Sequence, residues 1–389
     1  MIKYLRGLLG GLWVACVVGA GVVSSAQAEP PIIPTPEEEA QAFFYSLPNE
    51  FFKTLLKKSP IEIDGQTLHP KYQYYLEQRQ SDIPIEVKRA DQKKRLQIPE
   101  QRARMLAGTD RNWTYRTKVT ARMKYTQDIK IPGPAGDITA RVYVPQTDRV
   151  EVLPVMVYFH GGGWLFASVD AADRAMRLLA NEGDVIVISS NYRMGPEHKF
   201  PAAHEDGYAA YKWARDNAAA FGGDPARVGI GGDSAGGNMA SSISYQLVKE
   251  GVEPPALQLL YYPAVDRRKE RYASYEKFGE GFGLDKSFST MMEELVYRSP
   301  KDKDDIRMSP MIAKSFKGMP PAIVATAGFD MLRDQGKAYA ERLEEDGVEA
   351  VYINYPSLIH GWLQWSGVMD DAEAACVETA RLAGKMLRQ

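Results

Sequence analysis

A serine flanked by glycines, in residues 231–237 (GGDSAGG), constrains the fold of this chain more than any other stretch. A short apolar run at 227–230 leads into it, and residues 238–249 have the pattern of a helix. A strand, a sharp turn and a helix in this order place a serine hydroxyl at the tip of the turn, where a base can reach it. Glycines two residues before and two after the serine, Gly232 and Gly236, allow the strand and the helix to approach closely. The stretch predicts a nucleophilic serine; the alternative, a turn that only begins a helix, would need no partner residues elsewhere.

Two partners for Ser234 are expected further along the chain, because on such a sheet the nucleophile is followed by its acid and then by its histidine. His360 is the only histidine after Ser234, and it closely follows the strand expected at 350–355. The preceding strand ends near Asp330 and Asp334. Asp330 is nearer the strand, whereas Asp334 falls in the first turn of a helix, where an acid is commonly a dipole or capping residue. The expected catalytic set is therefore Ser234, Asp330 and His360, with the acid orienting the histidine ring.

Three successive glycines follow another apolar strand pattern, in residues 160–164 (HGGGW). Backbone N–H groups without neighbouring side chains can approach a substrate oxygen closely, as an oxyanion hole requires. Gly162, Gly163 and Ala235 are the expected donors, and Gly161 is a further candidate.

Apolar runs alternate with helical patterns from about residue 121 to the end of the chain. Strands are expected at 127–131, 137–144, 154–159, 185–190, 227–230, 257–262, 322–327 and 350–355, and helices at 171–181, 203–221, 238–249, 333–346 and 371–388. This alternation predicts an α/β protein with a mostly parallel sheet covered by helices on both faces. An aromatic- and methionine-rich stretch at about 266–300 interrupts it and is expected to form part of a helical cap. The catalytic domain is expected to span 121–389.

The N-terminus has the pattern of a targeting segment. Lys3 and Arg6 precede an apolar run at 8–23, which ends in small residues before Ala28. Residues 1–28 are therefore expected to be a signal peptide, which makes the protein exported, periplasmic or extracellular, with no stable membrane insertion after cleavage. A retained membrane anchor is the alternative, and a lipid attached at Cys16 is another.

Residues 29–120 are polar, rich in helix-forming residues and interrupted by prolines. Helices are expected at 41–57, 68–80 and 86–106, and no strand pattern is present. The apolar faces of these helices are narrow, so we expect the segment to lie on the next domain as a cap.

Composition excludes several classes of partner. The 389 residues carry a net charge of −2, without the basic excess of a nucleic-acid surface. His69, His198 and His204 lack the spacing of metal ligands, and no phosphate-binding loop is present, so neither a metal nor another cofactor is expected. A small molecule is the expected partner, and the oligomeric state is left open.

Five motifs in a fixed order resemble the hormone-sensitive-lipase-like esterases, the bacterial family IV carboxylesterases. They are residues 160–164 (HGGGW), 192–203 (YRMGPEHKFPAA), 232–237 (GDSAGG), 330–334 (DMLRD) and 359–361 (IHG). The resemblance extends from about Ile129 to the C-terminus, and the segment before it is longer than the usual cap of the family. It implies an α/β-hydrolase fold with a helical cap, a Ser234–His360–Asp330 triad, and hydrolysis of short- to medium-chain carboxylic esters without a cofactor.

Two other functions stay open at this point. The same triad would serve an amidase, a deacetylase or a lactonase, because pocket shape decides the leaving group. A ligand-binding protein on a hydrolase fold is the other alternative, although such relatives usually lose a triad member and His360 is present here.

Overall fold

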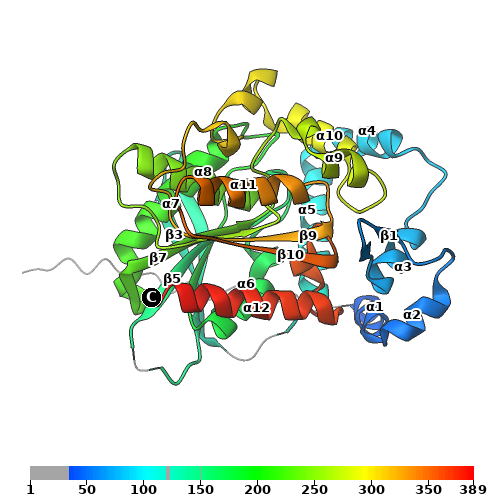
Figure 1. The fold of residues 1–389 in the computed structure, drawn as a ribbon, viewed down its shortest axis with the longest axis horizontal. Coiled ribbons are helices and arrows are strands. Elements are labelled where there is room, and N and C mark those ends of the chain that lie inside the picture. Colours follow the sequence, from blue (N-terminus) through cyan, green and yellow to red (C-terminus); the bar gives the residue numbers. More distant parts are fainter. Residues whose placement is uncertain (1–34, 120–122, 150) are drawn as a thin grey trace, which may run out of the picture.

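The computed structural model describes residues 35–119, 123–149 and 151–389 (Figure 1). The expected signal peptide, residues 1–28, lies outside these described residues. Within them, no helix combines the length and apolarity that a membrane span requires.

A twisted sheet of eight strands forms the centre of the molecule, in the order β10-β9-β8-β7-β5-β6-β4-β3. The strands are β3 (Met123–Gly133), β4 (Gly136–Pro145), β5 (Leu153–Phe159), β6 (Ile186–Ser190), β7 (Gly223–Asp233), β8 (Gln258–Tyr261), β9 (Ala322–Phe329) and β10 (Ala350–Ile359). β4 pairs antiparallel with β3 and β6, and all other neighbours in this sheet are parallel. The expected α/β class and mostly parallel sheet are confirmed.

Helices cover both faces of the sheet (Figure 1). One face carries α6 (Val169–Gly183) and α12 (Asp370–Met386), and the other carries α7 (Ala202–Asn217), α8 (Ala235–Lys249) and α11 (Arg333–Glu345).

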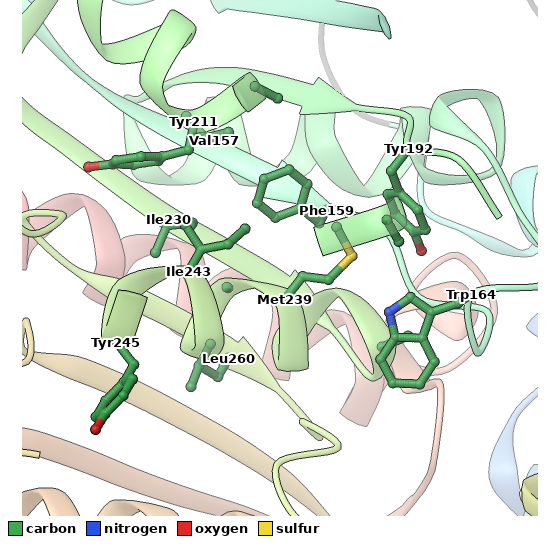
Figure 2. Close-up of a cluster of buried hydrophobic side chains, with 14 of the residues drawn as sticks. Val157, Phe159, Trp164, Tyr192, Tyr211, Ile230, Met239, Ile243, Tyr245 and Leu260 are labelled. Atoms are coloured by element: carbon green, nitrogen blue, oxygen red, sulfur yellow. The ribbon is translucent and has the colours of Figure 1, made fainter. Parts of the chain in front are cut away.

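Side chains of the central strand β5 alternate between the two layers of core. Met156 and Tyr158 pack in the cluster that contains residues of α6 and α12. Val157 and Phe159 pack on the opposite side with Met239 of α8, as Figure 2 shows. Because both faces are buried, the strand is an uninterrupted apolar run, which is why its position could be predicted.

The N-terminal segment contains more elements than the sequence indicated. Its helices are α1 (Pro36–Ser46), α2 (Asn49–Leu55), α3 (Pro70–Gln78), α4 (Ile85–Leu96) and α5 (Pro99–Arg116). The single helices expected at 41–57 and 86–106 are therefore wrong, because Pro48 and Pro99 interrupt them. Proline has no N–H for the helix ladder and disfavours helical geometry in the residue before it.

The expectation that this segment has no strand is also wrong. β1 (Glu62–Ile63) and β2 (Gln66–Thr67) form a small antiparallel hairpin. Asp64 and Gly65 turn the chain with φ of 56° and 72°, the pair of positive values that a tight hairpin turn requires. Strands of two residues are too short to produce an alternating pattern in the sequence.

The N-terminal elements gather at one end of the sheet, beyond the ends of β9 and β10 (Figure 1). α4 lies against α10 (Lys286–Val296), which follows α9 (Ala273–Phe278) within the stretch at 266–300. Two ion pairs join α4 to this stretch: Arg89 with Asp285 at 2.5 Å and Lys93 with Glu294 at 2.6 Å.

Candidate active site

Ser234 lies at the sharp turn between β7 and α8, with φ of 54° and ψ of −111°. A Cβ atom at Gly236 would overlap the carbonyl oxygen of Phe159 on the neighbouring strand β5. A Cβ atom at Gly232 would overlap the backbone of Gly236. Only glycine fits at these two positions, so the turn can hold the serine hydroxyl at the carboxyl end of the sheet.

The structure brings together Ser234, His360 and Asp330. Ser234 Oγ lies 2.9 Å from His360 Nε2, and His360 Nδ1 lies 2.8 Å from Asp330 Oδ2. Asp330 follows β9 directly, and His360 follows β10, so the carboxyl ends of three strands supply the three side chains. Asp334 lies apart from them and accepts a hydrogen bond of 2.8 Å from the Ser274 N–H.

Hydrogen bonding fixes the tautomer of the histidine. The carboxylate of Asp330 is buried and can only accept, so Nδ1 of His360 carries the proton. The lone pair of Nε2 then faces the Ser234 hydroxyl. The Tyr262 ring packs against the histidine with 4.7 Å between ring centroids and limits its rotation. This arrangement can remove a proton from the serine.

The loop after β5 presents two of the expected oxyanion donors to the same cavity. Gly162 and Gly163 have φ of 105° and 65°, and both line the cavity that contains Ser234. No acceptor in the described part of the chain takes the N–H of Gly162, Gly163 or Ala235. Gly161 differs, because its N–H donates a 2.8 Å hydrogen bond to Asp233 Oδ1 and is therefore occupied.

Asp233 is a residue whose contribution the sequence did not reveal. Its buried carboxylate accepts hydrogen bonds from the Tyr158 hydroxyl at 3.0 Å and from the Gly161 N–H at 2.8 Å. Burial raises the pKa of this carboxyl, and the two hydrogen bonds act in the opposite direction. Asp233 thus ties the glycine loop to the turn that carries Ser234. Its only sequence signal was its place beside the serine.

Two cavities meet at Ser234. The larger, of about 250 Å³, is lined by His360 and the glycine loop, and also by Tyr75, Trp113 and Arg116 from the N-terminal segment. The smaller, of about 30 Å³, is lined mainly by apolar side chains, among them Met292, Met331 and Leu332. Phe288 of α10 borders both cavities. The residues from α3 and α5 were not predicted, because tertiary packing alone brings them to the site.

Two other histidines, His160 and His204, serve local structure. Burial lowers the pKa of His160 and of His204 to about 4, so both are neutral at physiological pH. His160 stacks on Tyr192, and His204 Nε2 lies 2.9 Å from Asn238 Oδ1. In the residues that the structure describes, no group of three or more histidine, cysteine or acidic side chains could hold a metal ion.

A family model described as alpha/beta hydrolase fold matches residues 156–364, which contain the serine turn, the glycine loop, Asp330 and His360. The chain belongs to the alpha/beta-hydrolase family. The matched residues begin within β5 and end in the short turn that follows β10, so they include the catalytic triad and the glycine loop and omit the N-terminal segment.

Several relatives of this alpha/beta hydrolase are named as ester hydrolases. It is 43% identical to "Carboxylic ester hydrolase LipN" of Mycobacterium tuberculosis over 61% of this chain, and it spans 64% of that protein's length. Two solved structures superimpose well on this chain. The ester hydrolase EH1AB1 from the metagenome of Lake Arreo has a TM-score of 0.71 and 38% identity, and the match covers 74% of this chain and 91% of that one. The carboxylesterase EstE1 from a metagenomic library has a TM-score of 0.70 and 34% identity, and the match covers 75% of this chain and 98% of that one. The resemblance to hormone-sensitive-lipase-like esterases is confirmed.

Proposed function

We propose that this protein is a serine carboxylesterase that hydrolyses short- to medium-chain carboxylic esters through an acyl-enzyme intermediate. The observation that carries the proposal is the continuous hydrogen-bonded path from Ser234 Oγ through His360 to Asp330, with distances of 2.9 and 2.8 Å. The esterase names of the relatives support the same activity.

In the first half of the reaction, His360 Nε2 takes the proton of Ser234 as the Oγ atom attacks the ester carbonyl carbon. The carbonyl oxygen gains negative charge and is stabilised by the N–H groups of Gly162, Gly163 and Ala235. Asp330 stabilises the positive charge on the histidine ring. His360 then gives the proton to the departing alcohol oxygen, which leaves the acyl group on Ser234.

In the second half, a water molecule takes the place of the alcohol. His360 Nε2 removes a proton from this water as its oxygen attacks the acyl carbon. The same three N–H groups stabilise the second oxyanion, and the proton on His360 returns to Ser234 Oγ as the acid is released. Every step uses side chains and backbone groups of this chain.

Initial rates on p-nitrophenyl esters of increasing acyl length test the proposal. We expect turnover that is highest for short acyl chains in the wild type and absent from a folded Ser234→Ala variant. No turnover of any ester by folded wild-type protein, or full turnover by the variant, would overturn it. A matched ester and amide pair separates an esterase from an amidase or a deacetylase on the same triad.

We propose further that the N-terminal segment at 29–120 and the insertion at 266–300 act together as a cap on the catalytic domain at 121–389. The ion pairs between α4 and the insertion support a cap in which the two segments are joined.

We also propose that the protein is exported after cleavage behind Ala28, an expectation that rests on the sequence pattern alone. N-terminal sequencing of protein from the periplasm or the medium should begin at Glu29, and an intact N-terminus in the cytoplasm would contradict export.

A further inference from the structure

Three charged side chains besides His360 line the larger cavity: Arg89, Arg116 and Asp233. Arg89 is paired with Asp285 at 2.5 Å, and Asp233 accepts two hydrogen bonds from its own surroundings. Arg116 differs from both, because no carboxylate among the described residues lies within ion-pair distance of it. The cavity wall therefore contains one buried cation without a counter-charge.

The surroundings of Arg116 hold its guanidinium in a fixed position. The residue is 7% exposed, and its Nε donates a 3.0 Å hydrogen bond to the carbonyl oxygen of Asn112, one turn earlier in α5. The guanidinium carbon lies 4.3 Å from the ring centroid of Trp365 and 5.8 Å from that of Tyr75. No acceptor within the described residues binds its two terminal nitrogens.

This environment favours an anionic ligand. A buried charge is costly unless it is paired, and aromatic faces satisfy a cation only in part. Stacking on the two rings leaves the N–H edge of the guanidinium for other partners. That edge matches the two oxygens of a carboxylate and binds them with paired, charge-assisted hydrogen bonds.

We infer that Arg116 is a specificity-determining residue and that the preferred substrates are esters bearing a carboxylate, which Arg116 binds in the larger cavity. The inference rests on the proposed esterase function. Arg116, Ser234 and His360 line the same cavity. One substrate molecule in this cavity can therefore place its carboxylate at Arg116 and its ester bond at Ser234. The carboxylate is on either the alcohol half or the acyl half of that substrate.

Two pairs of substrates distinguish these halves, and within each pair the charged and the neutral member have nearly the same size. For the alcohol half, 4-acetoxybenzoate is compared with 4-acetoxybenzamide. For the acyl half, the 4-nitrophenyl monoester of adipic acid is compared with that of adipamic acid. We expect kcat/KM for the charged member of one pair to exceed that of the amide by about tenfold to a hundredfold, the range of a charge-assisted hydrogen-bonded pair.

Three variants assign the preference to Arg116. In Arg116→Gln the ratio of charged to neutral rates should fall to about one, and Arg116→Lys should keep part of it because the charge remains. Arg79→Gln is the matched control, because Arg79 stacks on the same Tyr75 ring at 5.2 Å but is exposed and does not line the cavity. A wild type that does not prefer the charged member of either pair, or an unchanged ratio in Arg116→Gln, would overturn the inference.

A binding measurement separates this inference from the proposed function. In calorimetry, Ser234→Ala protein should bind the charged product of the preferred pair (4-hydroxybenzoate or adipate) at least tenfold more tightly than its amide (4-hydroxybenzamide or adipamate). The Ser234→Ala/Arg116→Gln protein should not show this difference. If no ester is hydrolysed but this difference is found, the esterase function fails and the anion site stands. Equal binding of the acid and the amide in both pairs of products to Ser234→Ala protein would contradict the site.

Discussion

At the scale of single residues, the backbone of Ser234 determines what its side chain can do. A non-glycine residue at φ of 54° and ψ of −111° is strained by about 1–3 kcal/mol. The close approach of β7 and α8 through Gly232 and Gly236 maintains that strain, and the hydroxyl is held toward His360 as a result. The serine therefore needs no rearrangement before it reacts.

The oxyanion assignment predicts the effect of Gly162→Ala. Gly162 has φ of 105°, and a Cβ atom there would overlap the carbonyl oxygen of Phe166. Alanine at this position must therefore displace the loop. Loss of one donor costs about 3 kcal/mol in the transition state, so kcat should fall on the order of a hundredfold. Steady-state kinetics with circular dichroism as a folding control measure this, and unchanged kcat would remove Gly162 from the oxyanion hole.

The assignment of the acid predicts different results for two neighbouring aspartates. Asp330→Asn removes the acceptor that fixes the His360 tautomer, so kcat should fall by about ten-thousandfold. Asp334→Asn is the control, since Asp334 bonds the backbone of Ser274 instead. Measured on the same ester, a larger loss in Asp334→Asn than in Asp330→Asn would reverse the assignment.

At the scale of elements, the junction of α5 with α6 contains a carboxyl group in an unfavourable environment. Ser168 caps α6 by accepting from the Asp170 N–H at 3.1 Å, and its hydroxyl donates to Asp110 Oδ2 at 2.8 Å. Burial, with a smaller contribution from the Asp170 charge, raises the pKa of Asp110 to about 6. The folded protein therefore favours the protonated form of Asp110.

This raised pKa makes the effect of Asp110→Asn depend on pH. Protonated Asp110 contributes stability that is fully present below the unfolded pKa of about 3.8 and is lost as pH rises through about 6. Asparagine stays neutral and can still accept from Ser168, so the variant should have a higher Tm than the wild type at pH 7.5. Near pH 4 the two should melt together. A lower Tm for the variant at pH 7.5 would contradict this account.

Burial and local sequence pattern decided which elements could be predicted and which could not. β5 and β9 are buried on both faces, so their apolar runs are visible in the sequence. The helices around Pro48 and Pro99 were joined in the prediction because apolar spacing continues across the breaks. Ser234, Asp330 and His360 were predictable because each follows a recognisable strand. Arg116 and Trp113 were not, because no local pattern shows that α5 reaches the cavity.

At the scale of the whole molecule, the N-terminal segment shares a core with the sheet. Phe52 and Tyr72 are fully buried and belong to the same apolar cluster as Tyr261 of β8 and Trp365. The rings of Tyr72 and Trp365 meet edge to face with 5.1 Å between centroids. Because this cluster continues into the sheet, the segment and the catalytic domain should unfold together.

Two adjacent phenylalanines test this shared core. Phe52→Ala empties a buried site and should lower the free energy of unfolding by about 3–5 kcal/mol. Phe51→Ala is the control, because Phe51 is 39% exposed, and it should lower the free energy of unfolding much less. Urea unfolding of Phe52→Ala, followed by tryptophan fluorescence and by far-UV circular dichroism, should shift both transitions equally. A separate transition at lower urea concentration, with the main transition unchanged, would show that the segment folds independently.

Covalent labelling tests most directly whether Ser234 is an activated nucleophile. A 4-nitrophenyl alkylphosphonate reacts with an activated serine and leaves an adduct that peptide mass spectrometry locates. We predict one adduct per chain, on Ser234, with ester turnover lost in proportion to labelling and labelling greatly slowed in Asp330→Asn. An adduct on another residue, or full ester turnover after Ser234 is labelled, would contradict the account.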